Sequence, residues 1–554
     1  MPIVRLRLLA ALLAVVLLTA LAIRFAKAQH SGIDTYAINN ARIVTVSGAT
    51  IERGTVVVRN GLIVAVGTNV SAPADARVID GTGLTVYPGL IDSYTNLGLP
   101  EAAPSPSVAP GGGGGFFLQQ AAPQTRPGGP NSTQPAGLQP ETMVEDVIRT
   151  GGTDVDSARN VGFTSALTLP RTGIWIGQSA LINLAGETPQ QMIVRSPVAM
   201  HVGFTPLRGS YPGSLMGVFA TLRQMMLDAQ RYRDSMQIYE RAPRGVRRPD
   251  TDRSLAALIP VLEGKMPVVM LANTEREIGR ALDLATEFKL KLIIAGGRES
   301  ARLTDRLLKQ DVPVLLSLNL PRRTTAAIPE ADPEPLRVLR ERVEAQQTAG
   351  KLARAKVRFG FESGSLPNAT DIMVNAGRTI ENGLSAEDAL RAFTIWPAEI
   401  LGVGNHLGSI EVGKIANLTV TRGDLFDRNS RVTHVFIDGR PVDLRPAAAG
   451  AAGRTNLTGA WTLNVNLGEE KTASLTLRQE GDRLTGSIQG PLGSGEISNA
   501  SIGNEIRFTV VLNIEGKTNE ATFAGTLSGN EIRGSVTIEG RAPGTFTATR
   551  STPN

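Results

Sequence analysis

Residues 86–98 read Val-Tyr-Pro-Gly-Leu-Ile-Asp-Ser-Tyr-Thr-Asn-Leu-Gly and stand at the border between two kinds of sequence. Before them, residues 34–88 hold short runs of branched apolar residues separated by turn dipeptides such as Asn60-Gly61, a pattern typical of antiparallel strands. After them, residues 89–402 alternate short apolar runs with amphipathic segments, which indicates a parallel sheet with helical crossovers. A region of this length predicts an α/β fold of the (β/α)8 TIM-type barrel class.

The alternating region carries local signals for its elements. Thr274 and Glu277 form a capping box that opens a helix, because each side chain can satisfy a backbone N–H at the helix start. Strand candidates are the apolar runs that begin at Phe163, Pro267, Lys291, Val312 and Lys356.

Beyond the barrel, residues 403–444 return to β patterning, so we expect one composite β-sandwich built from both ends of the barrel. An Ala/Gly-rich hinge at 445–454 leads to residues 455–554, whose alternation predicts about eight strands in a small antiparallel all-β barrel. Its start, Gly459-Ala-Trp461, resembles the opening of lipocalin-type barrels. Trp461 is expected to plug the barrel rather than to contact a ligand.

Two further segments stand outside these domains. Residues 100–139 are rich in Gly and Pro and predict a flexible insertion within the barrel. Residues 1–28 combine a basic start, an apolar run and the site Ala26-Lys-Ala28, which predicts a signal peptide cut after Ala28. The alternative is an uncleaved anchor helix, but the apolar run is shorter than the ~20 residues that a span needs. We therefore expect a periplasmic or secreted protein.

Composition excludes several classes of function. The chain has no cysteine, which rules out disulfide scaffolds, thiolate zinc sites and cysteine nucleophiles. Its formal charge of +6 includes four basic residues of the signal segment, so the mature chain is nearly neutral. Neither nucleic acid nor a membrane surface is an expected partner.

Residues 86–98 closely resemble the first barrel strand of the amidohydrolase superfamily, in its imidazolonepropionase-like and metal-dependent dipeptidase-like branch. The far end agrees through Gly383-Leu-Ser-Ala-Glu-Asp-Ala-Leu-Arg-Ala-Phe-Thr394, Leu407-Gly-Ser-Ile-Glu-Val-Gly-Lys-Ile-Ala-Asn-Leu418 and Asp438-Gly-Arg-Pro-Val442. The resemblance spans residues 34 to about 444. It implies a distorted (β/α)8 barrel with the composite β-sandwich, and hydrolysis of C–N bonds other than peptide bonds, with zinc or another divalent metal at the strand ends.

In this sequence the ligand positions that the resemblance implies are replaced. The His-x-His of the first strand corresponds to Tyr94-Thr-Asn96, and the histidines of the fifth and sixth strands correspond to Leu271 and Ala295. The aspartate of the last strand corresponds to Glu362, and the family's aspartate after Gly-Lys-x-Ala is Asn417. The bridging Lys or Glu of the fourth strand has no match. We therefore expect no metal and no other cofactor.

The remaining ionisable residues leave two interpretations open. The four histidines, His30, His201, His406 and His434, are expected to be structural and to lie away from the barrel strand ends. Glu362 either survives as a catalytic acid/base or is a leftover carboxylate that faces a solvated pocket or pairs with Arg298. Asp92 is expected to support its strand.

Three functional hypotheses follow. The first is an exported pseudoenzyme that binds a small-molecule ligand or a partner, such as an active relative or a second copy of itself. The second is an active hydrolase with a metal-free or weakly metal-dependent site that uses Glu362, with Tyr94 or Asn96. The third is capture of an apolar or glycan ligand inside the C-terminal barrel.

Overall fold

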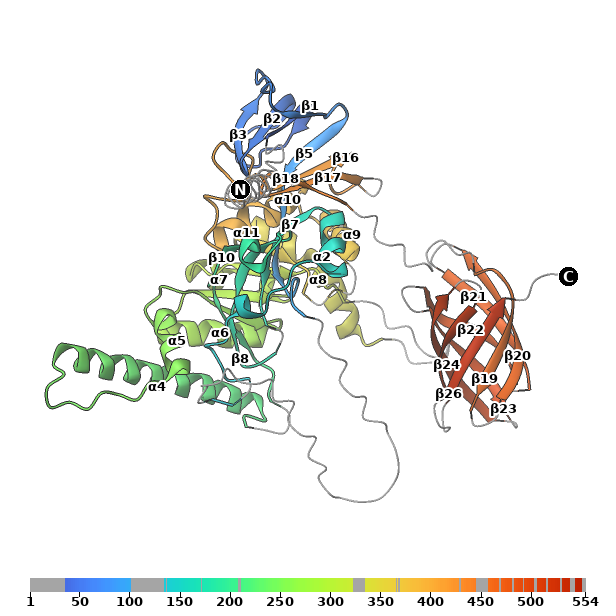
Figure 1. Ribbon diagram of the computed structural model, residues 1–554. Helices are drawn as coiled ribbons and strands as arrows, with labels where there is room; N and C mark the ends of the chain where they lie inside the picture. The colour runs from blue at the N-terminus through green and yellow to red at the C-terminus, as the bar shows by residue number, and fades with distance from the viewer. Residues whose placement is uncertain are drawn as a thin grey trace, which may run out of the picture. The chain divides into compact units, whose positions relative to one another are not determined.

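The computed structural model describes residues 35–100, 134–135 and 137–550, with interruptions at 171, 208–210, 322–333, 365, 367–368, 428–429 and 445–456 and, in the last unit, at 468–469, 481–482, 492, 503–505, 515–516, 529–530 and 539–543. The chain divides into two compact units, Met1–Leu444 and Arg445–Asn554 (Figure 1). The predicted signal peptide, most of the Gly/Pro-rich insertion and the predicted hinge lie outside the described residues. Within the described part, no helix combines the length and the apolarity needed to cross a membrane.

The first unit carries the composite β element at both of its ends. Its sheet has the order β18-β17-β16-β5-β1-β2-β3, with β4 paired to β1. The strands are β1 (Thr35–Ile43), β2 (Ile51–Arg59), β3 (Leu62–Gly67), β4 (Arg77–Asp80), β5 (Leu84–Pro88), β16 (Leu418–Arg422), β17 (Arg431–Ile437) and β18 (Arg440–Val442). The two chain ends are joined where β5 pairs antiparallel with β16, so one apolar core contains residues from both, among them Ile38, Val86 and Phe436.

Between these ends lies the predicted barrel, in two sheets. One has the order β10-β9-β7-β6 and the other β15-β14-β13-β12-β11-β8. The strands are β6 (Leu90–Thr95), β7 (Phe163–Thr168), β8 (Trp175–Gln178), β9 (Ala180–Asn183), β10 (Ile193–Arg195), β11 (Met200–Gly203), β12 (Val268–Ala272), β13 (Leu292–Gly296), β14 (Val314–Ser317) and β15 (Phe359–Glu362). The first and last barrel strands meet where the Ser93 hydroxyl donates to the carbonyl of Phe361 at 2.6 Å.

The barrel departs from regular alternation at one place. β6 and β7 are parallel, as are β11 to β15, but β9 runs antiparallel to β7 and β8 antiparallel to β11. The short β8 and β9 therefore stand where another parallel strand would complete a regular barrel. The sequence resemblance implies a distorted barrel, and the structure shows that the distortion lies at these two strands.

Helices cover the outside of the barrel. They are α2 (Thr153–Asn160), α3 (Pro189–Met192), α4 (Leu215–Arg241), α5 (Arg253–Leu262), α6 (Glu275–Phe288), α7 (Thr304–Lys309), α8 (Leu336–Arg354), α9 (Ala369–Glu381), α10 (Ala386–Phe393) and α11 (Ile395–Ile400), with 3-10 turns η1 (Val144–Val147) and η2 (Ser300–Arg302). The predicted capping box is confirmed, because Thr274 accepts from the N–H of Glu277 while the Glu277 carboxylate accepts from that of Thr274. The far end of α4 extends beyond the rest of the unit (Figure 1).

A buried polar junction joins the composite sheet to the barrel. The Asn417 side-chain amide, just before β16, donates to Ser165 Oγ at 2.9 Å and to Asn183 Oδ1 at 2.7 Å. Asn417 Oδ1 accepts from the backbone N–H of Asp438 at 2.8 Å. Asn417 therefore connects β7, β9 and the β17–β18 turn.

The second unit is a closed antiparallel barrel, as predicted. Its strands are β19 (Gly459–Asn466), β20 (Glu470–Glu480), β21 (Arg483–Gly490), β22 (Gly493–Ile502), β23 (Ile506–Ile514), β24 (Lys517–Ser528), β25 (Glu531–Ile538) and β26 (Gly544–Arg550), and β26 pairs back to β19. Trp461, Phe508 and Phe523 are buried in its apolar core. The Trp461 indole N–H donates to the carbonyl of Leu457 at 3.0 Å, and the Arg550 guanidinium lies 5.0 Å from its ring centre.

Candidate functional site at the barrel mouth

The predicted site residues come together at the carboxyl ends of the barrel strands. Tyr94 lies on β6, Leu271 on β12, Ala295 on β13 and Glu362 on β15, and Asn96 follows β6 directly. In the strand register Leu271 stands beside Ala295, and Ala295 stands beside Leu315. The strand ends that hold ligands in barrel enzymes are therefore occupied here by these five positions.

Apolar side chains fill the interior next to these positions. Ala295 and Leu315 are fully buried in one cluster with Val269 and Ile293, and Leu271 packs against it. Aliphatic carbon offers no lone pair to a metal, so two of the replaced positions contribute only packing.

Glu362 is buried rather than solvated, which contradicts the expectation of a solvated pocket. It is 2% exposed and lies beside Ser317, Gly364 and the Asp92 carboxyl. Burial, and next the charge of Asp92, raise the pKa of Glu362 well above its usual value. The site therefore favours the uncharged form of this carboxyl, and its Oε2 has no hydrogen-bond partner among the described residues.

The alternative pairing of Glu362 with Arg298 is also wrong. The partners of the Glu362 carboxyl are Ser317 and Gly364, whereas Arg298 lines a separate cavity described below. Gly364 has φ +57°, and a Cβ there would stand 2.8 Å from Glu362 Oε2. A glycine at 364 is thus required both by the backbone conformation and by the buried carboxyl.

Asp92 ties the first barrel strand to the last, in agreement with its predicted structural role. Its carboxylate accepts from the Ser363 N–H at 3.0 Å and from the Ser363 hydroxyl, and more weakly from the Tyr94 N–H at 3.4 Å. Burial raises the pKa of Asp92 to about 6, although the hydrogen bonds from Ser363 oppose this shift. Two neighbouring carboxyls in one dry site favour at most one negative charge.

His201 is the site residue that sequence reasoning missed. It lies on β11 beside Val269 of β12, and because parallel partners point to the same face, its ring faces the barrel interior. Its ring centre is 5.7 Å from that of Tyr94. The register places His201 two residues before Gly203, which stands beside Leu271, so His201 lies inside the barrel rather than at the strand end. Its strand could not be located from the sequence, because the four residues of β11 show no clear period.

The His201 imidazole is neutral and has no hydrogen-bond partner within the described part of the chain. The residue is fully buried, and both ring nitrogens are unpartnered. Burial lowers the pKa of His201 to about 3. Burial, and next the charge of Glu362, raise the pKa of Tyr94, so that residue also stays uncharged. Of the other histidines, His406 is exposed, His434 is half-buried on β17, and His30 lies outside the described residues.

These residues do not fit a divalent metal. In the described ranges, no group of three or more His, Asp or Glu side chains could hold an ion. Glu362 at the mouth and His201 inside the barrel stand among alkyl side chains and a neutral phenol. The chemistry of this donor set favours uncharged hydrogen bonding over ligation of zinc.

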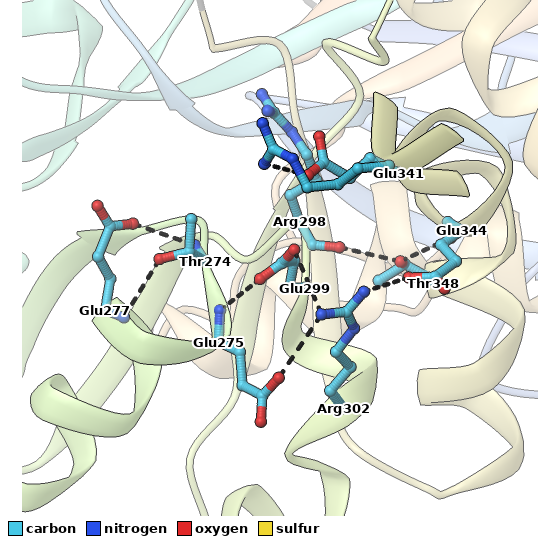
Figure 2. Close-up of polar contacts among 10 residues, drawn as sticks. Thr274, Glu275, Glu277, Arg298, Glu299, Arg302, Glu341, Glu344 and Thr348 are labelled. Atoms are coloured by element: carbon cyan, nitrogen blue, oxygen red, sulfur yellow. Dashed lines mark hydrogen bonds and ion pairs between the residues drawn. The ribbon is translucent and has the colours of Figure 1, made fainter. Parts of the chain in front are cut away.

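A charged cavity lies at the ends of β12 and β13, against α8 (Figure 2). Its volume is about 230 Å³. It is lined by Asn273, Thr274, Arg298, Glu299, Ala301, Arg302, Arg337, Glu341, Glu344, Ala345, Thr348 and Lys351. Sequence reasoning weighed only Arg298 among these residues, because the others become neighbours through the packing of α8.

Comparisons with known proteins agree with the fold. The model of the Amidohydrolase family matches residues 330–442. The chain is 24% identical over 428 residues to the amidohydrolase tasK of Hapsidospora irregularis, which covers 70% of this chain and 39% of that protein. It is 34% identical over 98 residues to a dihydroorotase of Anaeromyxobacter dehalogenans, which covers 17% of this chain and 23% of that protein. The chain thus aligns with less than half the length of either curated relative.

A solved structure extends this similarity over the first unit. An amidohydrolase from Thermotoga maritima MSB8 has a TM-score of 0.61 and 25% identity, covering 74% of this chain and 100% of that chain.

Proposed function

The chain belongs to the amidohydrolase superfamily of hydrolases, and from that premise we propose that it is a metal-free member whose barrel mouth binds an uncharged small molecule without hydrolysing it. The observation that carries the proposal is the apolar filling at the strand ends, where Leu271 and Ala295 stand in place of metal ligands. Metal-assisted hydrolysis needs a metal to make hydroxide from water near neutral pH. Without a metal, the barrel keeps an opening at the strand ends but lacks the hydroxide nucleophile.

The polar groups that remain support an uncharged ligand. His201 and Tyr94 are neutral in this dry environment, and burial favours the uncharged form of Glu362. The Asp92 carboxyl is already held by Ser363. Burying an ionic group beside them would cost far more free energy than burying an amide, which can both donate and accept hydrogen bonds. The unpartnered Glu362 Oε2 and His201 nitrogens offer such bonds, so we propose an amide or cyclic amide as the ligand class.

Two measurements test this proposal. The mature protein is dialysed against trace zinc and manganese, and its metal content is measured by inductively coupled plasma mass spectrometry. We expect far less than one metal ion per chain, and no metal-dependent turnover of a panel of amides and cyclic amides. Stoichiometric metal with metal-dependent C–N hydrolysis would overturn the proposal.

A second candidate function is supported by the Glu362 carboxyl, whose uncharged form is a suitable general acid beside Tyr94. In this case the chain hydrolyses a C–N bond without metal. Glu362→Gln should then abolish turnover with little loss of stability, since it keeps the shape and removes the proton. Asn96→Ala, at the rim of the same mouth, is the comparison variant for ligand positioning. Equal turnover of Glu362→Gln and wild type would remove this candidate.

Export and partnership are parts of the same proposal. We propose that residues 1–28 direct the chain out of the cytoplasm and are cut after Ala28, which N-terminal sequencing of the cell-envelope or secreted fraction tests. A chain that starts at Met1 in that fraction would contradict cleavage. We further propose an active relative or a second copy as a partner, and light scattering with co-purification tests for either.

The C-terminal barrel offers less support for ligand capture. Its described interior is occupied by large side chains such as Trp461, Phe508 and Phe523. An eight-stranded barrel is only just wide enough to be filled in this way. We therefore place the ligand at the mouth of the first barrel.

A further inference from the structure

The charged cavity beside α8 is a built feature of the first unit. Two consecutive glycines, Gly296 and Gly297, have φ +81° and +57° and turn the chain sharply after β13. A Cβ would stand 2.5 Å from Asn273 Oδ1 at the first and 2.5 Å from a Val314 methyl at the second. This turn brings Arg298 to α8, where the Thr348 hydroxyl donates to the Arg298 carbonyl at 3.0 Å.

One face of α8 forms the opposite wall. The helix residues that line the cavity are spaced three or four apart and so share one face of the helix: Arg337, Glu341, Glu344, Ala345, Thr348 and Lys351. Its buried residues Ala345 and Thr348 form the floor of the cavity, and the charged residues stand around them at the more exposed rim. The small side chains of Ala345 and Ala301 leave the space open.

Every carboxylate in the cavity wall is already paired. Glu344 contacts Arg302 at 2.7 Å, and Glu341 contacts Arg337 at 2.8 Å. Glu299 accepts from the backbone N–H of Glu275 at 2.7 Å and lies 3.6 Å from Arg302 (Figure 2). These acids therefore compensate Arg302 and Arg337.

Two cations in the wall remain uncommitted. The guanidinium of Arg298 and the ammonium of Lys351 make no hydrogen bond or ion pair with the described residues, although Lys351 acts on Glu344 at longer range. A guanidinium presents parallel N–H donors that fit a carboxylate or a phosphate. The volume of about 230 Å³ is below the ~300 Å³ at which drug-sized pockets begin, so the occupant must be small.

We propose that this cavity binds a small organic anion, a carboxylate or a phosphate ester, between Arg298 and Lys351. The cavity is lined by residues that follow β12 and β13, and none of Tyr94, His201, Leu271, Ala295 or Glu362 lines it. The proposal therefore does not depend on whether the chain hydrolyses C–N bonds.

Calorimetric titration of the full chain with succinate and with inorganic phosphate tests the proposal. We expect saturable binding of at least one probe, and the probe that binds distinguishes a carboxylate from a phosphate source. Arg298→Gln and Lys351→Gln should each weaken binding at least tenfold. Arg276→Gln is the matched control, because Arg276 is an exposed cation of nearby α6 outside the cavity, and it should bind as wild type does.

A cavity-filling variant separates the site from general surface charge. Ala301→Leu removes space without changing charge and should also abolish binding. Its unfolding temperature and that of the charge variants, compared with wild type, show whether the fold is kept. The proposal is overturned if neither probe binds saturably, if Arg276→Gln weakens binding as much as Arg298→Gln does, or if a folded Ala301→Leu variant binds as wild type does.

Discussion

At the barrel mouth, positions where the family resemblance implies metal ligands hold side chains that pack or make neutral hydrogen bonds. Leu271 and Ala295 could be placed from the sequence, because they lie near the ends of clear apolar runs. The environment of Glu362 could not, since its burial depends on Asp92 and Ser317, which come from other strands. The position of His201 could not be predicted for a related reason, because the four residues of β11 are too few to show a period.

His201 gives a prediction for the pH dependence of stability. Its folded pKa of about 3 lies below the ~6.5 of an unfolded histidine, so only the unfolded chain takes up a proton between these values. The free energy of unfolding therefore falls as pH drops below about 6.5. Between pH 6.5 and pH 4, we expect the free energy of unfolding to fall by about 3 kcal/mol less in His201→Leu than in wild type.

Urea unfolding at several pH values measures this difference. His406→Leu, at an exposed histidine, is the control and should keep the wild-type pH dependence. Asp92 has the opposite sign, because its raised pKa makes its contribution greatest at low pH and lost as pH rises through about 6. For that reason the comparison is made between variants and not on the wild-type curve alone. Parallel curves for His201→Leu and wild type would show that the imidazole is not buried as described.

At the scale of elements, apolar runs located β7, β12, β13, β14 and β15, and the capping signal located the start of α6. The parallel strand β11 was not predicted. The antiparallel β8 and β9 were not foreseen, because strands of four fully buried residues show no alternation. Contacts between elements that lie far apart in the sequence could not be predicted either. Nothing in the local sequence indicates that Asn417 contacts Ser165 and Asn183.

The contacts of Asn417 predict that a single substitution at this position strongly lowers the free energy of unfolding. Asn417→Ala would remove the amide that donates to Ser165 Oγ and to Asn183 Oδ1, and would leave the part-buried Asp438 N–H without its acceptor. Each of these three hydrogen bonds contributes about 0.5–1.5 kcal/mol, so we expect a loss on the order of 2–4 kcal/mol in the free energy of unfolding. Chemical denaturation measures it, with Asn69→Ala at an exposed turn residue of ordinary backbone conformation as a comparison. A loss below about 0.5 kcal/mol would mean that water replaces the amide.

At the scale of the whole molecule, the sequence predicted both units because each has its own patterning, and each has its own hydrophobic core. Calorimetry should accordingly resolve two unfolding transitions. Trp461→Ala, which removes a large buried side chain from the second core, should lower the temperature of one transition alone by several degrees. Trp175→Ala is the counterpart in the first core and should lower the other. A single transition that both variants shift equally would show one cooperative unit.

The pairing of β5 with β16 has a consequence for the newly made chain. β5 leaves the ribosome before any of the barrel, whereas its neighbour β16 is synthesised only after the whole barrel. At a synthesis rate of ~5–20 residues per second, tens of seconds pass before β16 is made, and during this time one edge of β5 has no partner strand. Such distant pairing also slows folding through the entropy of closing a long loop. Completion of the composite sheet therefore depends on β16 to β18. A chain released before residue 418 could not complete the sheet that its first strands begin.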